Sequence, residues 1–566
     1  MDYFPGSWPV AVTVCSVSEF PPAHDPIAAG RAALSGGRWL EARARFREAL
    51  AGEATPAALE GMSWADWWLE DVPACLDTRE RAYRMYRQAG DARGAARVAL
   101  WLGDAYIEFR GATAVADGWF GRAARILEDL GPTPEHGWLA VFEANAALDR
   151  RDVPAAKRLA EHARGLGRRF GAVDLEMFSL ATEGVAMVDQ GDVEQGMRCL
   201  DEATAAALGG EYENLAPAAW TCCRLMSACE ELRDYERGTQ WCQKIEEFSL
   251  RMDTRFVTGV CRAHYAVILT WHGSWTVAER ELLAAVAGLT AKRPHWRAEA
   301  LVRLGELRRR QGRYAEAEDL FAQTREHPLA QQGLAELSLD REDPGTARDL
   351  LERLLRRIPR DITTGRAVPL ELLVSAAVAM GDYGAAATRL EELRSLAAVM
   401  STPPLRASVR LLEGLLAAGT GDHEEACDRF EDAVDLFTGC RAPVEAGRAR
   451  LELAAALLAL GRTGAAEREA RAALECLEKA GTPAGNARAQ ALLTTLGTSA
   501  AGSRPLSERQ LQVLRLVAEG LGDKDIADRL VLSEHTVHRH VANIYLRLGC
   551  SSRAAAVAHA SRLGLL

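Results

Sequence analysis

Apolar residues recur at helical spacing along most of the chain, and short polar breaks separate the apolar runs. Between about residues 26 and 497 the breaks divide paired helical patterns, and most breaks are a glycine followed by a polar residue. They occur at Gly37-Arg38, Arg151-Asp152, Gly191-Asp192, Arg233-Asp234, Gly273-Ser274, Gly312-Arg313, Glu342-Asp343, Gly381-Asp382, Gly421-Asp422 and Gly461-Arg462. From Asp152 onward their second residues are separated by 40, 42, 40, 39, 30, 39, 40 and 40 residues. This period predicts one helical hairpin per repeat, with the break at its turn.

A small residue and an aromatic residue four positions later open the second helix of several repeats. The pairs are Ala42/Phe46, Ala116/Phe120, Ala317/Phe321 and Ala426/Phe430. The small side chain lets the paired helix approach, and the ring fills the space one turn further on. A single hairpin cannot bury its apolar faces, whereas stacked hairpins share one continuous core. We therefore predict an all-α superhelical array of roughly ten to eleven hairpins, right-handed, with a concave inner surface and without strands.

Fragments of a known repeat support this architecture. Leu102-Gly103-x-x-Tyr106 and Leu304-Gly305 match parts of the first-helix pattern of tetratricopeptide repeats, and the region resembles that family. Its period is longer than the ~34 residues usual there, so the likeness is to the architecture and not to a strict consensus. Repeat arrays of this kind mainly bind proteins, which implies an effector or partner in the concave groove.

Three further helical patterns follow one another near the C-terminus. Ser507 and Gln510 have the spacing of a capping box, and the helix they begin is expected to end at Gly520. A second helix is expected over residues 523–530, and Ser533 is expected to cap a third. The apolar positions of the third helix are Val537, Val541, Ile544 and Leu548. Their helical spacing predicts that this face points into a core.

The opposite face of the third helix carries short polar and basic side chains. They are His535, His538, Arg539, Ala542 and Asn543. Two helices joined by a tight turn, with such side chains on the first turns of the second, describe a helix-turn-helix that reads the major groove. The alternative is a small three-helix bundle with a solvated polar face.

The same stretch resembles the DNA-binding domain of LuxR-type (GerE-like) transcription regulators over about 60 residues. The matching residues are Leu506-Ser507, Val513-Leu514, Asp523-Lys524-Asp525-Ile526-Ala527, Ser533-Glu534-His535-Thr536-Val537-His538-Arg539-His540-Val541 and Arg547-Leu548-Gly549. The resemblance implies a small four-helix domain over residues 505–566 and a last helix, at about 553–563, that mediates dimerisation.

The resemblance and the polar face of the third helix together predict a set of DNA-binding residues, in which Arg547 and Arg553 are expected to contact the DNA backbone. The set is Lys524, Ser533, Thr536, Val537, His538, Arg539, His540, Ala542, Asn543, Arg547 and Arg553. Within it His538, Arg539 and Ala542 match base-reading positions, and Lys524 and Thr536 match phosphate contacts. The family often has Lys or Arg at the position of His538, so base preference and pH dependence are open at this site.

The order of parts resembles that of the large LuxR regulators related to the maltose activator, with one departure. Those proteins carry an ATP-binding domain with a glycine-rich loop that ends in Gly-Lys. This chain has five lysines, Lys157, Lys244, Lys292, Lys479 and Lys524, and none follows a glycine. No phosphate-binding loop of that type can therefore be drawn. A receiver domain is not expected either, because the N-terminal part shows no strand–helix alternation.

Charge is unevenly distributed along the chain. Residues 504–566 hold nine Arg or Lys and six Asp or Glu, a balance of +3. Because the net charge of the whole chain is −11, the remaining residues together carry −14. A basic module on an acidic body suits a protein that touches nucleic acid at one end. The divisions that we predict are a poorly ordered segment at 1–25, repeats at 26–497, a linker at 498–504 and the DNA-binding domain at 505–566.

Twelve scattered cysteines and the absence of a long apolar run favour a cytoplasmic protein that does not span a membrane. Cys222, Cys223, Cys229 and Cys261 could form a metal or redox site, although buried cysteines more often pack in cores. Several tryptophans could line a ligand groove, although such residues are also more often core. They are Trp67, Trp68, Trp101, Trp241, Trp271 and Trp275. No motif assembles a catalytic set, so we expect neither an enzyme nor a bound cofactor or metal.

The sequence therefore predicts a DNA-binding transcriptional regulator whose repeats bind an effector and control presentation of the helix-turn-helix. The expected partners are double-stranded DNA, a second copy of the chain and an effector protein or small molecule, with RNA polymerase as a further candidate. Two alternatives are an interaction scaffold whose tail docks a partner, and a regulator that senses metal or oxidant through its cysteines. The operator, the effector, the sign of regulation and the oligomeric state without DNA are not specified by the sequence.

Overall fold

The computed structural model describes residues 25–566 except 290–291, 326, 361, 363, 503–505, 507, 551 and 563–564, and at 255–256, 498–502 and 546–547 it describes the backbone alone. Every regular element in this part of the chain is an α-helix, 29 in all, and it contains no strand. The predicted all-α fold is therefore confirmed. The chain divides into two compact units, Met1–Val409 and Arg410–Leu566, and the boundary falls within α21 (Pro403–Thr420).

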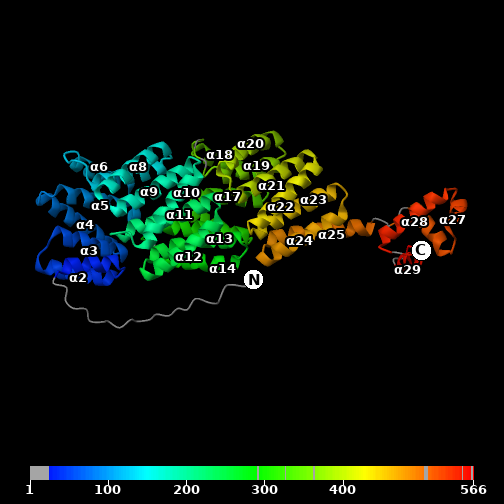
Figure 1. Ribbon diagram of the computed structural model, residues 1–566, viewed down its shortest axis with the longest axis horizontal. Helices are drawn as coiled ribbons and strands as arrows, with labels where there is room; N and C mark the ends of the chain where they lie inside the picture. The colour runs from blue at the N-terminus through cyan, green and yellow to red at the C-terminus, as the bar shows by residue number, and fades with distance from the viewer. Residues whose placement is uncertain are drawn as a thin grey trace. The chain divides into compact units, whose positions relative to one another are not determined.

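The first unit holds ten helical hairpins, each made of an odd-numbered helix and the helix that follows it (Figure 1). Their helices are α1 (Pro26–Ser35), α2 (Trp39–Gly52), α3 (Pro56–Trp68), α4 (Val72–Gln88), α5 (Ala92–Arg110), α6 (Thr113–Leu127), α7 (Pro134–Asp149), α8 (Val153–Phe170), α9 (Val173–Asp189), α10 (Val193–Gly209), α11 (Leu215–Leu232), α12 (Tyr235–Arg251), α13 (Arg255–Trp271), α14 (Trp275–Gly288), α15 (Pro294–Arg310), α16 (Tyr314–Gln323), α17 (Pro328–Asp340), α18 (Pro344–Arg356), α19 (Ala367–Ala379) and α20 (Tyr383–Met400). Odd-numbered helices of neighbouring hairpins also touch, as α5 touches α7 and α15 touches α17. This stacking is the predicted tetratricopeptide-like arrangement.

The second unit continues the alternation and ends in a small separate domain. Its repeat helices after α21 are α22 (His423–Gly439), α23 (Pro443–Ala459), α24 (Thr463–Ala480) and α25 (Pro483–Gly502). The four helices of the C-terminal domain are α26 (Glu508–Ala518), α27 (Asp523–Leu530), α28 (Glu534–Leu548) and α29 (Arg553–Arg562). The division between repeats, linker and C-terminal domain at residues 498–504 stays a prediction.

Each of the ten predicted breaks is a turn with a left-handed residue at its first position. Seven of these residues are glycines, from Gly37 at φ 71° to Gly191 at φ 91°. Where glycine is missing, Arg151, Arg233 and Glu342 adopt the same conformation at φ 63°, 56° and 60°. The turn geometry is therefore kept without glycine, at the steric penalty that a side chain incurs there. Five aspartates after these turns accept a backbone amide three residues on: Asp152, Asp234, Asp343, Asp382 and Asp422.

The aromatic residues of the repeats fill slots between helices. Phe321 is 0% exposed, and a Cβ added at Gly305 or Gly333 would lie 2.7 or 2.3 Å from its ring. Phe46 and Phe430 are buried in the same way against glycines of adjacent helices. Because a side chain at these glycines would collide with the ring, the aromatic residue and the glycines form one packing unit.

Arg293, just before α15, joins hairpins that are far apart in the sequence. Its Nε donates to Glu70 Oε1 at 3.0 Å, and its Nη1 pairs with Glu108 Oε1. The guanidinium carbon lies 4.2 Å from the ring centroid of Trp67 and 4.8 Å from that of Phe109. Arg293 is 1% exposed. Its charge is therefore compensated by two carboxylates and two aromatic faces instead of water.

Other contacts within the first unit bridge similar distances along the chain. They are Trp39 Nε1 to Asp253 O at 3.0 Å, Trp296 Nε1 to Glu108 Oε1 at 2.9 Å, Arg233 Nη2 to Glu371 Oε2 at 2.8 Å, and Thr364 Oγ1 to Asp189 Oδ1. Their partners are 214, 188, 138 and 175 residues apart. Later hairpins therefore pack on earlier ones, and polar bonds fix how they meet.

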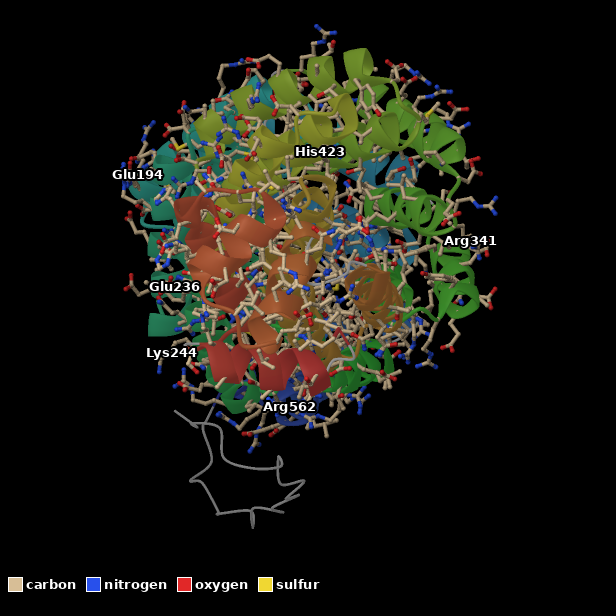
Figure 2. The ribbon with its side chains drawn as sticks, turned by 90° about the vertical axis from the view of Figure 1, so that its right-hand side faces the viewer. Glu194, Glu236, Lys244, Arg341, His423 and Arg562 are labelled. Atoms are coloured by element: carbon tan, nitrogen blue, oxygen red, sulfur yellow. The ribbon has the colours of Figure 1, made fainter. Side chains whose placement is uncertain are left out.

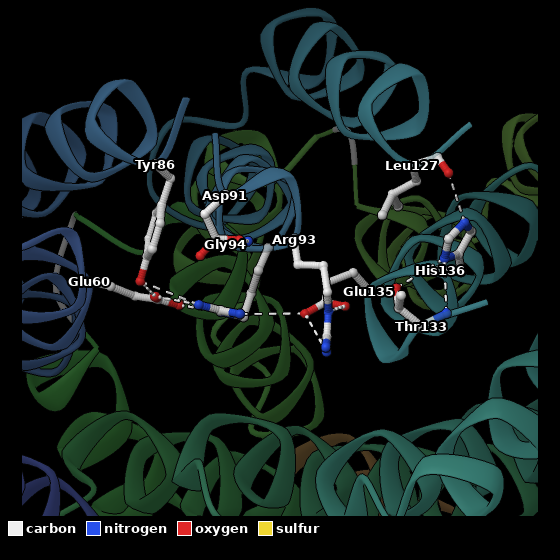
Figure 3. Close-up of polar contacts among 10 residues, drawn as sticks. Glu60, Tyr86, Asp91, Arg93, Gly94, Leu127, Thr133, Glu135 and His136 are labelled. Atoms are coloured by element: carbon white, nitrogen blue, oxygen red, sulfur yellow. Dashed lines mark hydrogen bonds and ion pairs between the residues drawn. The ribbon is translucent and has the colours of Figure 1, made fainter. Parts of the chain in front are cut away.

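A polar network also ties neighbouring hairpins together near the N-terminus (Figure 3). Arg97 donates to both carboxylate oxygens of Glu60, at 2.7 and 2.8 Å, and Glu135 receives both Arg93 and Arg97. Tyr86 donates its hydroxyl to Glu60 at 2.8 Å. Burial, followed by the nearby Glu60 carboxylate, raises the pKa of Tyr86. Every member has a partner, as expected of a network that fixes helix positions.

Glu194, Glu236 and Arg341 of the first unit are exposed, and their side chains point outward in Figure 2. Among the described residues, no helix is both long enough and apolar enough to cross a lipid bilayer.

Candidate nucleic-acid interface

The C-terminal domain is built around the apolar face predicted for its third helix. Val537, Val541, Ile544 and Leu548 of α28 are 0%, 6%, 1% and 6% exposed. They pack in one core with apolar residues of the other three helices, among them Leu514 of α26. This buried stripe fixes the rotation of α28 about its own axis, so the residues on its other face must point outward.

The turn between α27 and α28 places the start of the third helix. Val531 ends α27 in the left-handed conformation, at φ 54°, and its side chain is 91% exposed. Ser533 then caps α28, because its Oγ accepts the backbone amide of Thr536 at 3.2 Å. The Ser533 hydroxyl also lies 2.7 Å from the Thr536 hydroxyl. The capping role expected for Ser533 is confirmed.

The outward face of α28 is the one that the spacing predicted. His535, His538, Arg539, Ala542 and Asn543 are all exposed. Arg539 makes no hydrogen bond or ion pair within the described residues, and the same holds for exposed Lys524 at the start of α27. Both cations are therefore available to a ligand outside the domain.

Three of the expected DNA-binding residues do not belong to this exposed face of α28. Val537 is 0% exposed, so it holds α28 in the core and its side chain is not available to DNA. Arg553 donates to Leu521 O at 3.0 Å and pairs with Asp523, so it is engaged within the domain. His540 is half-buried. The side chains of Arg547 and of Ser507, the expected cap of α26, lie outside the described residues.

Sequence reasoning missed two residues that shape this face. Asp523, the first residue of α27, binds both His538 Nδ1 at 3.3 Å and Arg553. Arg509 of α26 donates to Leu530 O at 2.7 Å and to Gln512 Oε1 at 2.8 Å, so it ties α26 to the end of α27. Because a carbonyl at the end of a helix lacks an internal partner, Arg509 satisfies a group that would otherwise need water.

Two helices joined by a tight turn, with a capped second helix that presents exposed polar side chains, define a helix-turn-helix DNA-binding domain. Residues 504–560 match the family of bacterial regulatory proteins of the luxR type. The C-terminal domain is thus a LuxR-family helix-turn-helix domain, as its motifs suggested.

Curated relatives match the same end of the chain. A protein of Mycobacterium bovis named as an HTH-type transcriptional regulator is 45% identical over 65 residues, which are 12% of this chain and 7% of the relative. The Fimbriae Z protein of Salmonella typhimurium is 48% identical over 48 residues, or 8% of this chain and 23% of the relative. The chain thus spans less than a tenth of the mycobacterial relative and about a quarter of the other.

Solved helical-repeat structures align with a larger share of the chain. The Cut9–Hcn1 hetero-tetramer of the APC/C is 13% identical, covers 83% of this chain and 95% of its own, and has a TM-score of 0.43. A Rap protein complexed with competence and sporulation factor is 15% identical, covers 68% and 98%, and has a TM-score of 0.38. Scores at this level do not define a shared fold.

The cysteines considered as a sensing site are core residues of the first unit. Cys222, Cys223, Cys229 and Cys261 are each between 0% and 3% exposed. Burial raises the pKa of Cys222 to about 12, and it raises the pKa of the other three as well. A thiol that stays protonated is a poor nucleophile and a poor metal ligand. The described residues also contain no cluster of three His, Cys, Asp or Glu side chains placed to hold a metal.

Most of the tryptophans considered for a ligand groove are core residues. Trp67 contacts Trp68 with ring centroids 4.8 Å apart, and Trp101 contacts Trp138 at the same distance. Trp67, Trp101, Trp271 and Trp275 are buried. Trp241 is half-buried and donates its Nε1 to Asp201 at 2.8 Å. Rings at these separations fill a core.

Proposed function

We propose that this protein is a sequence-specific DNA-binding transcriptional regulator whose helical repeats control the helix-turn-helix domain. The supporting observation is the exposed face of α28, where Arg539 has no partner among the described residues and lies in the first two turns of a capped helix on a fixed core. A cation without an internal partner, on a helix held at this angle, is suited to reach a base edge in the major groove.

The residues proposed to contact DNA divide into two kinds. Arg539 can donate two hydrogen bonds to N7 and O6 of guanine, and Ala542 can only touch the methyl group of thymine. Lys524 and Thr536 are proposed to contact phosphates, which set the register of the domain on the duplex. Base selection thus rests on few side chains, of which Arg539 is the strongest donor.

Two copies of the chain are proposed to bind one site. The family resemblance assigns dimerisation to the last helix, α29, whose Ala556 and Ala560 face the domain core while Ala554, Ala555 and Ala558 are exposed. A two-fold dimer requires two half-sites separated by about one helical turn of DNA, or a multiple of it. RNA polymerase is a further proposed partner when the dimer is bound beside a promoter.

The repeats are proposed to bind an effector protein or small molecule. This role is supported by the acidic repeat region and by the stacked hairpins, which present an extended surface. An effector acts only through a difference in its affinity for two states of the protein. Contacts such as that of Arg293 with Glu108 are places where two such states of the repeats could differ.

Selection of bound sequences from a random pool of duplex DNA by the full-length protein tests the proposal. We expect a two-fold consensus, and we expect Arg539→Ala to weaken binding by about 1–3 kcal/mol and relax the preference at one base pair of each half-site. Arg515→Ala is the matched control, since Arg515 is an exposed arginine of α26 that also lacks a partner in the described residues.

Two outcomes would contradict the proposal. If Arg539→Ala weakened binding equally on every sequence, its contact would be to phosphate and the reading of bases would lie elsewhere. If the full-length protein bound no duplex, the chain would be better described as an interaction scaffold.

A further inference from the structure

The carboxylate of Asp523 connects the recognition helix α28 with α29. Its Oδ2 lies 3.3 Å from His538 Nδ1, and its Oδ1 pairs with Nη2 of Arg553. Arg553 is itself anchored, because its Nη1 donates to Leu521 O at 3.0 Å. The side chain of Asp523 is 22% exposed and that of His538 is 76% exposed. A fixed, mostly buried carboxylate therefore holds one nitrogen of a ring that otherwise faces solvent.

This contact determines which nitrogen of the neutral ring carries the proton. A neutral imidazole has one N–H donor and one acceptor, and a carboxylate can only accept. Asp523 therefore favours the form with the proton on Nδ1 and leaves Nε2 as an acceptor. When the ring takes up a second proton, Nε2 becomes a donor, and the bond from Nδ1 to Asp523 becomes charge-assisted and stronger. The ring stays anchored while its free nitrogen reverses its hydrogen-bonding role.

We propose that His538, oriented by Asp523, is a proton-dependent determinant of base preference. This inference rests on the DNA-binding function proposed above. In the major groove cytosine presents an amino donor, adenine an amino donor beside the acceptor N7, and thymine the acceptor O4, whereas guanine presents two adjacent acceptors, N7 and O6, and no donor. Neutral His538 is suited to accept from adenine or cytosine, and protonated His538 is suited to donate to guanine. The preferred base at one position of each half-site therefore shifts toward guanine as the pH falls.

Among the described residues, the charged and titratable side chains near His538 are those of Asp523, Arg553, Glu534, His535 and the adjacent Arg539. Asp523 faces it from α27, and Arg553 of α29 reaches it only through Asp523. On α28 itself, Glu534 and His535 precede it by four and three residues and share its side of the helix. His535 is the neighbour whose own protonation could imitate the effect, so it supplies the control.

The test is selection of bound duplexes by the full-length protein at pH 5.5 and at pH 8, an interval in which imidazole side chains change charge. We expect the ratio of guanine to adenine or cytosine at one position to change by about five- to tenfold between the two pH values. His538→Gln should abolish this shift, and His538→Lys should favour guanine at both pH values. His535→Gln should leave the shift in place.

Variants of Asp523 and Arg553 test the role of the carboxylate. Asp523→Ala should weaken the preference for adenine or cytosine at pH 8 and preserve the preference for guanine at pH 5.5, because the charged ring donates from both nitrogens without help. Since this change also releases Arg553, Arg553→Met provides the comparison: it loosens α29 but keeps the imidazole contact, so the pH-dependent shift should remain.

Three results would overturn the inference. Identical base preferences of the wild type at both pH values would do so and leave the proposed regulator function intact. If the pH-dependent shift persisted in His538→Gln but disappeared in His535→Gln, His535 and not His538 would be responsible for it. Failure to select any sequence at either pH would remove the proposed function together with this inference.

Discussion

Replacing Arg293 by methionine is expected to destabilise the first unit by about 3–5 kcal/mol, the range for removing one partner of a buried ion pair. We expect the loss of stability to fall in the upper part of that range, because Arg293 is buried and both of its carboxylate partners are largely buried. Arg293 is 1% exposed, while its partners Glu70 and Glu108 are 18% and 11% exposed. The substitution leaves two carboxylates with little access to water. Methionine fills much of the volume, so the loss should come from charge and not from a cavity.

Arg313 offers a matched control because it also pairs with two carboxylates. Its side chain donates twice to Glu316, at 2.7 Å each, and lies 3.4 Å from Glu279. It is, however, 43% exposed and its partner Glu316 is 50% exposed. Water therefore replaces the lost contacts, and Arg313→Met should change stability by about 1 kcal/mol or less.

Urea unfolding of the full-length variants, followed by circular dichroism, measures the difference. The first transition to lose helix should move to lower urea in Arg293→Met and stay in place in Arg313→Met. Adding Glu108→Gln to Arg293→Met should recover part of the loss, since one unpaired charge disappears. If the Arg293 and Arg313 variants unfold alike, the Arg293 site is hydrated and the account of this contact is wrong.

Three further predictions concern single residues and the charge of the C-terminal domain. Val531→Gly should raise the free energy of unfolding by about 0.5–1 kcal/mol, and with it the melting temperature, because Val531 is β-branched and has a φ of 54°. An unchanged melting temperature would show that the backbone strain is relieved locally. Burial acts to raise the pKa of Glu299, but Arg303 and His327 outweigh it and hold that pKa well below its usual value. The contribution of Glu299 to the free energy of unfolding is therefore fully present above about pH 4.3 and is lost as the pH falls further. The stability of Glu299→Gln, followed by acid unfolding, should therefore depend less on pH below about 4 than the stability of the wild type. DNA binding should weaken steeply with added salt, with a slope set by the few phosphate contacts, and a flat profile measured by fluorescence anisotropy would contradict the proposed docking.

Local features of the fold were predictable because their causes are local. A left-handed residue followed by a cap marks a turn, and all ten predicted breaks proved to be turns. The breaks at Arg151, Arg233 and Glu342 lack glycine, but each lies between two helical patterns and is followed by an aspartate. The inward face of α28 was predictable for the same kind of reason, since helical spacing fixes which side chains share a face.

Contacts between distant segments were not predictable from the same patterns. The contact of Arg293 with Glu108 depends on the packing angles of all the hairpins between α5 and α15. No single turn determines how these angles add up. The contact of Asp523 with His538 depends on the angle between α27 and α28, which the pattern of apolar positions does not specify. Arg553 was predicted to contact the DNA backbone, and the sequence pattern gave no sign of the Leu521 carbonyl to which it donates.

The energy held in the first unit limits how an effector can act. A tenfold change in DNA affinity needs a coupling free energy of about 1.4 kcal/mol between the two sites. Breaking the contact of Arg293 would cost about 3–5 kcal/mol, which is more than that coupling. An effector that opened this contact would therefore have to replace it, with a cation of its own placed between Trp67 and Glu108. An effector without such a group must act through the less costly exposed pairs, and Arg293→Met should leave its response unchanged.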